Sequence, residues 1–351
     1  MNNKVHSSFF VLTGLIFCLV YILVAVKPLG KEIQFVPEWK IDVTNPSIAK
    51  DAESEAMLPF KLGQTLGYFT PEGEVTNFIT FPQKAFISDS AYTFYNINNT
   101  AASIFNPDGT LKTKINAAGF PMIDEDRIFN FLPGGAAFSK YNEEGKAEWT
   151  YSGAVPLTAF DSSEKSIAAG FADGTICQFD MNGNLVQRFA PGGSEIPVIL
   201  GIAVSSNGQY IAAICGQNRQ RFVLAKKDGV HTKIISHEFL DSKETRQTLL
   251  KFSRDDSTVY YNSGKILGIE NVKTGKIKHI KIEGQAISIQ ETDKYTFVLT
   301  KDGDKYSVYT IETFATYIGK FSFKANSSFI KTYKNCLFVG KDHSISCIKI
   351  K

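Results

Sequence analysis

The sequence has few of the residues that redox, metal or nucleic-acid chemistry would require. It holds five cysteines in 351 residues, and its net charge is +3, with 38 Lys and Arg against 35 Asp and Glu. The cysteines form no Cys-x-x-Cys pair, which excludes the common zinc and thioredoxin-type motifs. A net charge this small, without any run of like charge, argues against a nucleic-acid binder.

Catalytic motifs are also absent. No G-x-S-x-G, H-E-x-x-H or P-loop string occurs. The acidic clusters Ser253–Ser257 and Lys301–Lys305 fit strand-to-strand turns better than calcium loops. The histidines show no metal-ligand spacing and are expected at solvated strand edges; they are His6, His231, His237, His279 and His343. We therefore predict no enzymatic activity, no cofactor and no metal.

An uncharged run near the N-terminus is the clearest single feature that is present. Ser7–Val26 is bounded by Lys4 and Lys27. A run of about 20 apolar residues crosses roughly 30 Å of hydrocarbon, which predicts a transmembrane signal-anchor helix over residues 7–27 after a short tail, 1–6. A cleaved signal peptide is the alternative, but its apolar region would be shorter, about 7–15 residues.

The anchor sets the expected location and the next segment. We predict a single-pass membrane protein with a cytoplasmic N-terminus and an exported, periplasmic or otherwise extracytoplasmic domain. Residues 28–62 hold four prolines and the acidic patch Lys50–Met57, which predicts an extended linker. Within it, Glu32–Val43 is apolar enough to dock on the domain or on a partner. Cysteines 177, 215, 336 and 347 are expected to be buried free thiols, and only Cys336 and Cys347 could be paired across one hairpin.

A repeat occupies the rest of the chain. A strand, a polar turn with glycine and a second strand recur, with the turn glycines at Gly73, Gly109, Gly145, Gly183, Gly229 and Gly275. Another strand pair precedes each of these hairpins, so the unit has four strands. The second strands of the units begin at Ala91, Arg127, Ser166, Tyr210, Thr258, Tyr295 and Cys336.

These spacings predict an all-β fold. Four antiparallel strands in every 36–48 residues, with no amphipathic helix between them, are typical of β-propeller blades. Seven second strands predict a seven-bladed propeller over residues 63–351. The last unit has only three strands, from Ser327, whereas Glu74–Phe81 is an outer strand in excess. We therefore expect N-terminal and C-terminal strands to close the last blade together, which covers both free edges.

Two segments resemble known repeats. Tyr141–Tyr151, with Gly145, Lys146 and Trp149, resembles the quinoprotein-type (PQQ-like) repeat, and Phe160–Gly183 is similar to WD-repeat blades. No blade ends in Trp-Asp, and the adjacent cysteines of many quinoprotein dehydrogenases are missing. An exported, anchored propeller also resembles scaffold subunits of bacterial envelope assembly machinery, including the propeller lipoprotein of outer-membrane protein insertion, although no lipobox is present. The resemblance implies a non-enzymatic protein-protein interaction scaffold whose partners are other membrane or periplasmic proteins.

Loops on the rim of the propeller are the expected contact residues. The loops Phe131–Phe138, Ala190–Val198 and Cys215–Arg221 stand out. The predicted partner-binding residues are Pro133, Pro191, Arg219, Arg221 and, in the linker, Trp39; the arginines could bind carboxylates. The alternative function is binding of a small ligand, glycan or peptide in the central channel, including by an enzyme with lost or altered quinoprotein chemistry. Convergent carboxylates or histidines at the channel mouth would favour that alternative.

Overall fold

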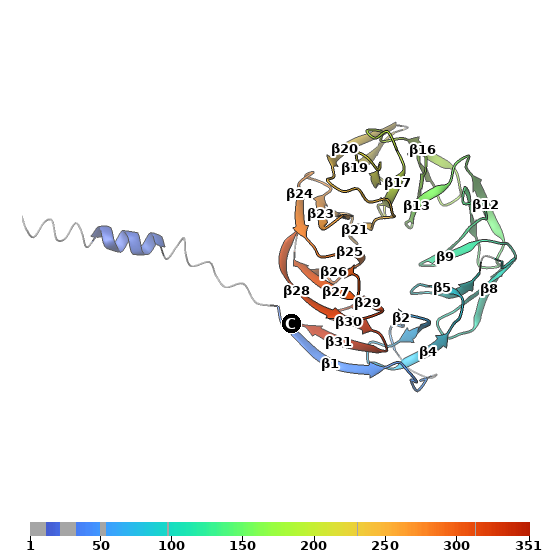
Figure 1. The fold of residues 1–351 in the computed structure, drawn as a ribbon, viewed down its shortest axis with the longest axis horizontal. Coiled ribbons are helices and arrows are strands. Elements are labelled where there is room, and N and C mark those ends of the chain that lie inside the picture. The colour runs from blue at the N-terminus through green and yellow to red at the C-terminus, as the bar shows by residue number, and fades with distance from the viewer. Residues whose placement is uncertain (1–11, 22–32, 50–53, 97, 230, 313) are drawn as a thin grey trace, which may run out of the picture.

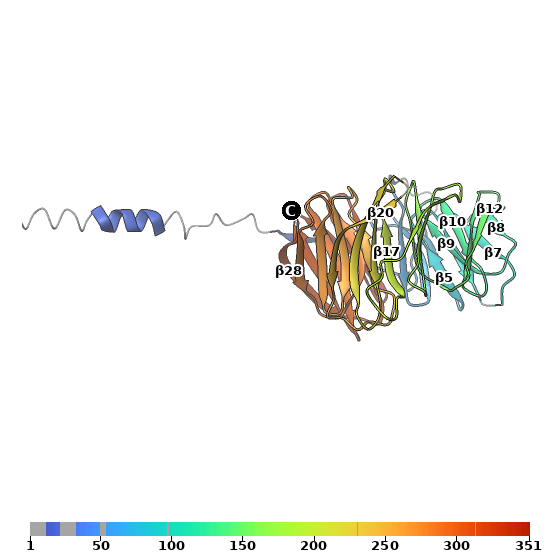
Figure 2. The same cartoon turned by 90° about the horizontal axis from the view of Figure 1, so that it is seen from above.

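The computed structural model describes residues 12–21, 33–49, 54–96, 98–229, 231–312 and 314–351. These residues form 31 β-strands in eight sheets, which are arranged as blades around a central axis (Figure 1). Seen from the side, the ring of blades is a short cylinder (Figure 2). The prediction of an all-β propeller with four-stranded antiparallel blades is confirmed, but the number of blades is eight, so the prediction of seven was wrong.

Six blades have four strands that follow one another in the chain, from the axis outward. Their strands are β5 (Lys84–Ile87), β6 (Tyr92–Tyr95), β7 (Ala102–Phe105) and β8 (Leu111–Ile115); β9 (Phe120–Asp124), β10 (Arg127–Phe131), β11 (Ala137–Tyr141) and β12 (Ala147–Ser152); β13 (Leu157–Ser162), β14 (Ile167–Phe171), β15 (Ile176–Phe179) and β16 (Leu185–Phe189); β17 (Ile199–Val204), β18 (Tyr210–Cys215), β19 (Arg221–Asp228) and β20 (His231–Phe239); β21 (Leu250–Phe252), β22 (Thr258–Ser263), β23 (Ile266–Asn271) and β24 (Ile277–Lys281); and β25 (Gln285–Glu291), β26 (Tyr295–Asp302), β27 (Lys305–Glu312) and β28 (Thr316–Lys324).

The blade that the repeat count missed has three strands, β2 (Leu58–Leu62), β3 (Thr65–Phe69) and β4 (Val75–Thr80). In several complete blades, the residue after the fourth strand donates its N–H to the turn between the second and third strands, as in Ile282 N to Lys265 O and Ala325 N to Asp304 O. The three-stranded blade has the equivalent bond, from Phe81 N to Gln64 O. The strands β2, β3 and β4 are therefore the second, third and fourth strands of a blade whose first strand is absent from the described residues.

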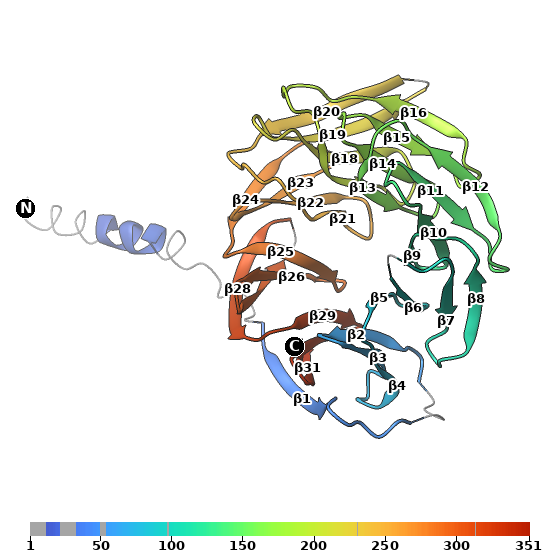
Figure 3. The same ribbon diagram turned by 45° about the vertical axis from the view of Figure 1, so that its right-hand side comes forward.

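The closing blade combines both ends of the propeller, but with a different strand from the expected one. Its first three strands, from the axis outward, are β29 (Ser328–Tyr333), β30 (Cys336–Lys341) and β31 (Ser344–Ile350), and β1 (Phe35–Asp42) is its outermost strand (Figure 3). The predicted closing segment, Glu74–Phe81, instead contains β4. The segment predicted as a linker, residues 28–62, thus contains the strands β1 and β2. Proline is tolerated in edge strands, and Pro37 lies in β1, the outer edge of its blade.

The N-terminal prediction is also corrected. The structure describes a helix over residues 12–21, and none of the helices in the described part of the chain is long and apolar enough to cross a membrane. The rest of the predicted anchor, residues 7–11 and 22–27, lies outside the described residues.

Neighbouring blades are held together by apolar side chains and by a recurring contact on the outer strands. Trp149 of β12 donates its indole N–H to the carbonyl of Met181 at 3.1 Å and covers Gly183 of the next blade. Trp39 of β1 does the same with the Pro71 carbonyl, also at 3.1 Å, and covers Gly73. Trp39 therefore occupies the repeat position of Trp149.

Candidate functional site

The two faces of the ring carry different turns. Consecutive strands of a blade are antiparallel, so the turns between first and second strands lie on one face, and those between second and third strands lie on the other. We call these the first-turn face and the second-turn face. Each face carries a surface that could bind a partner or ligand.

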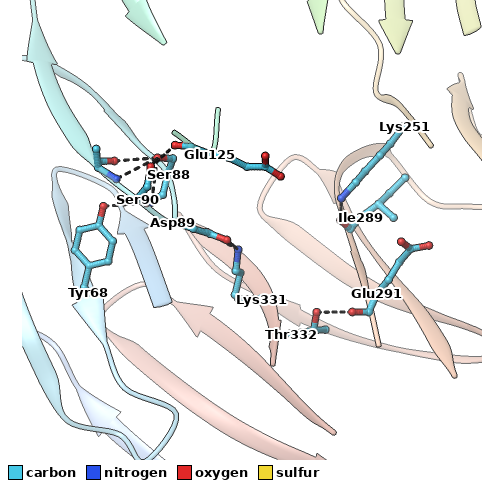
Figure 4. Close-up of polar contacts among 11 residues, drawn as sticks. Tyr68, Ser88, Asp89, Ser90, Glu125, Lys251, Ile289, Glu291, Lys331 and Thr332 are labelled. Carbon is cyan, nitrogen blue, oxygen red and sulfur yellow. Dashed lines mark hydrogen bonds and ion pairs between the residues drawn. The ribbon is translucent and has the colours of Figure 1, made fainter. Parts of the chain in front are cut away.

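Charged side chains gather where the channel opens on the first-turn face (Figure 4). Lys331 of β29 donates to both carboxylate oxygens of Asp89, which follows β5, at 2.5 and 2.7 Å. Because β29 and β5 belong to the blades on either side of the three-stranded blade, this ion pair spans that blade. The two side chains differ in solvent exposure, which is 19% for Lys331 and 64% for Asp89.

Lys251 of β21 is the cation at this mouth without a carboxylate partner in the described structure. Its Nζ donates to the carbonyl of Ile289 at 3.2 Å. Enclosure by the channel walls lowers the pKa of Lys251, and the nearby Glu291 opposes that shift. The Glu291 carboxylate accepts the backbone N–H of Arg254 at 2.8 Å, and its carbonyl accepts the hydroxyl of Thr332 at 2.8 Å.

The remaining carboxylates of the mouth have internal partners. Asp161 of β13 is half-buried and accepts the backbone N–H of Val204 at 2.8 Å, and desolvation by the surrounding protein raises its pKa to about 7. Asp124 pairs with Arg127 at 2.7 Å and also accepts the hydroxyl of Ser162. Carboxylates therefore do converge at the channel mouth, but hydrogen bonds and ion pairs within and between blades already hold them.

A cavity of about 450 Å³ opens beside these charges. Its lining residues include Ala56, Met57, Asp89, Lys251, Phe252, Arg254, Glu291, Lys331 and Tyr333, and no histidine is among them. Three cations and two carboxylates line it, a formal balance of one positive charge. Ala56 and Met57 lead into β2, so the cavity lies beside the innermost described strand of the three-stranded blade.

The second-turn face carries an apolar and cationic surface between the blades of β13–β16 and β17–β20. Arg221 donates from Nη2 to the carbonyl of Pro191 at 2.7 Å. The guanidinium carbon of Arg219 lies 4.9 Å from the ring centroid of Phe239, and that of Arg221 lies 6.0 Å from it. Phe239 is 51% exposed. We call Pro191, Ile196, Arg219, Arg221 and Phe239 the rim patch.

The rim patch depends on two loops that the sequence singled out separately. The loop after β16 and the loop between β18 and β19 pair through Gln217 N to Ile196 O at 3.1 Å. Asn218 binds both Ser194 and Glu195 across the same gap. Ile196 is 48% exposed beside this junction.

Three of the five predicted partner-binding residues therefore lie together, and two do not. Pro133 lies in the turn between β10 and β11, in another blade. Trp39, in the closing blade, packs against Phe338 of the same blade and Phe69 of the three-stranded blade. Sequence reasoning missed Phe239, whose signal was an aromatic residue at the end of the outer strand β20.

Comparisons with known proteins agree with the ring of blades. The fold defines a β-propeller protein. A family model described as "beta-propeller protein" matches residues 1–351, and the chain belongs to this family. An uncharacterized protein of Treponema pallidum (strain Nichols) is 29% identical over 314 residues, covering 86% of this chain and 83% of that protein.

Two solved structures are similar in fold. BamB from Moraxella catarrhalis superposes with a TM-score of 0.61 and 16% identity, covering 90% of this chain and all of that one. A chain of the Mitotic Checkpoint Complex superposes with a TM-score of 0.54 and 12% identity, covering 92% and 94%. At these identities the similarity shows the propeller fold.

Proposed function

We propose that this propeller is a non-enzymatic protein-protein interaction scaffold that binds a partner protein through the rim patch. The observation that carries the proposal is Phe239, a half-exposed aromatic ring flanked by two guanidinium groups on a rigid strand end. Aromatic and arginine side chains are the types that contribute most to protein interfaces.

The chemistry of the patch defines the partner. Pro191, beside Arg221, and the exposed Ile196 add apolar surface to the patch, and the described contacts give Arg219 no carboxylate partner within the chain. A complementary surface would offer an apolar pocket for the ring and Asp or Glu side chains for the guanidinium groups. The finding that a similar propeller chain is part of the Mitotic Checkpoint Complex supports a role in assembly.

Crosslinking followed by affinity purification of the full chain from its own cells tests the proposal. F239A and the pair R219A/R221A should each reduce capture of the main partner more than tenfold, because hot-spot truncations cost about 2 kcal/mol or more. L185A/R188A is the matched control, since it removes an exposed leucine and an exposed arginine from β16, outside the patch. Equal losses in the patch and control variants would contradict a docking role for the patch.

The setting of the scaffold stays a prediction. We propose an extracytoplasmic location in an envelope complex, which follows from the uncharged run before the propeller and from the resemblance of the repeats. Protease treatment of intact and permeabilised cells would check it. Degradation only after permeabilisation of every membrane, the inner one included, would place the propeller in the cytoplasm instead.

The cavity on the first-turn face supports a second candidate, the binding of a small anionic ligand. Among the described residues Lys251 has one hydrogen bond to a carbonyl and no carboxylate partner, so its ammonium group could bind a carboxylate or phosphate. Citrate and inorganic phosphate are suitable probes in thermal unfolding. Stabilisation that K251M removes and K84M retains would support this function, and equal stabilisation of all three proteins would reject it.

A further inference from the structure

Three possible metal ligands meet where the closing blade joins the two ends of the propeller. Glu38 comes from β1, Cys336 from β30 and Cys347 from β31. Their carboxylate and thiol ligand atoms all lie within 4.8 Å of one another, and both cysteines are free. Cys347 is buried, Cys336 is half-buried and Glu38, on the outermost strand, is exposed, so an ion could enter from the outer surface of the ring.

A β-bulge directs Glu38 toward the thiols. Pro37 lies opposite Ile348 and Trp39 lies opposite Cys347, so Glu38 is an extra residue in β1 without a partner of its own. Bulges of this kind redirect a side chain locally. The carboxylate is thereby placed next to the cysteines of two neighbouring strands.

Another blade provides an internal comparison. In β12, Glu148 is the extra residue before Trp149, as Glu38 is before Trp39. Trp149 lies opposite Lys140, and Lys140 forms an ion pair with Glu148. In the closing blade, Cys347 lies opposite Trp39 and so occupies the position that Lys140 has in β11. A thiol, and not an ammonium group, therefore lies beside Glu38 at this position.

We propose that Glu38, Cys336 and Cys347 bind a zinc ion that fastens β1 to the C-terminal hairpin and so holds the ring closed. Two thiolates and a carboxylate, with water in the fourth position, are a donor set that suits Zn²⁺. With bonds of about 2.0–2.3 Å, tetrahedral ligand atoms lie roughly 3.3–3.8 Å apart, so atoms that lie within 4.8 Å of one another would close by at most about 1.5 Å on binding the ion.

Charge balance favours the same ion. Two thiolates, one carboxylate and Zn²⁺ sum to one negative charge, and the ammonium group of Lys349 lies 3.0 Å from Glu38. Lys349 would remain as an outer partner of the bound carboxylate. Because thiols bind zinc as thiolates, zinc binding must release both thiol protons to solvent and should weaken as the pH falls.

A disulfide fits the strand register less well. Cys336 lies opposite Lys349, whereas Cys347 lies opposite Phe338, so the two cysteines are diagonal neighbours. Diagonal positions on antiparallel strands are about 7–8 Å apart at Cα. Cysteines more than about 7 Å apart at Cα require backbone movement before they can be bridged.

Cobalt substitution of the full chain tests the site. The reduced, metal-free protein should bind one Co²⁺ per chain with thiolate-to-cobalt absorption, and Zn²⁺ should remove that absorption. Loss of an outer-shell partner already lowers metal affinity about 10–100-fold, so E38Q should lower it at least tenfold, while the matched variant E148Q should leave it unchanged.

Thermal unfolding supplies the second measurement. Zn²⁺ should raise the unfolding temperature of the wild type and of E148Q, because a ligand of the native state stabilises it, but not that of C336S. The proposal is overturned if bound cobalt shows no thiolate absorption or if E38Q and E148Q weaken binding equally. It is also overturned if Cys336 and Cys347 form a disulfide and the reduced protein binds no metal.

Discussion

Single side chains set the contact between neighbouring blades. Trp39 and Trp149 each cover a turn glycine of the next blade and donate to the carbonyl two residues before it. In the three-stranded blade, Asn77 makes the equivalent bond to the Pro107 carbonyl at 2.9 Å, two residues before Gly109. The repeat therefore preserves a hydrogen-bond geometry, while the side chain that provides it varies.

The turn glycine beneath Trp149 can be tested directly. G183A places a methyl group 2.6 Å from the indole ring at a φ of +83°, so it adds a steric clash to backbone strain. G275A, at a φ of +66° with open space around it, adds only the strain. We expect G183A to lower the free energy of unfolding about 1–3 kcal/mol more than G275A, measured by urea denaturation. Equal losses would show that the contact with Trp149 adds nothing.

The buried carboxyl of Glu270 predicts a pH dependence. Burial, with a contribution from Glu238, raises the pKa of Glu270 to about 7 from an ordinary value of 4.5. Above pH 4.5 the unfolded chain loses this proton while the folded protein keeps it, so folding stability should fall as the pH rises from about 4.5 to 7. E270Q should flatten that fall in urea denaturation, and E143Q, in an exposed turn, should not.

At the scale of elements, the outer strands share a feature that sequence reasoning could not locate. Seven of the eight outer strand pairs contain a register shift in their hydrogen-bond ladder, and the shift leaves one extra residue in the outer strand. In β12 the extra residue is Glu148, directly before Trp149, and in β1 it is Glu38, directly before Trp39. A bulge depends on the pairing of two strands, so the pattern of one strand does not reveal it.

The strand β1 predicts the behaviour of a shortened chain. A chain that starts at residue 44 lacks β1 and leaves the edge of β31 unpaired. Exposed strand edges pair with other chains, so we expect oligomers or aggregates by light scattering after size exclusion. A chain that starts at residue 33 keeps β1 and should remain monomeric. A monomeric, folded protein without β1 would show that this strand is dispensable for closure.

At the scale of the whole molecule, the ion pair of Lys331 and Asp89 links the closing blade to the blade of β5–β8 across the three-stranded blade. Because Asp89 is largely exposed, we expect a coupling energy below about 1 kcal/mol in a double-mutant cycle of K331M and D89N. Added salt should reduce it. A coupling of several kcal/mol would instead indicate a channel mouth from which water is largely excluded.

The sequence predicted the architecture better than the number of blades. Turn glycines and second strands reveal blades because each blade repeats the same hairpins. The three-stranded blade was missed because no first strand belongs to it among the described residues, and because Pro59 and the acidic patch before it resemble a linker. The channel-mouth charges were missed because Asp89, Lys251 and Lys331 come from three blades and meet only when the ring closes.

The pairing of β1 with β31 also sets the order of events during synthesis. β1 is translated first among the strands, yet its partner begins at Ser344, roughly 300 residues later. At about 5–20 residues per second the ribosome needs roughly 15–60 s to make that stretch. Throughout this interval the nascent chain carries an unpaired β1, so ring closure must await the synthesis of β31, and a chaperone that covers β1 would have its greatest effect in that interval.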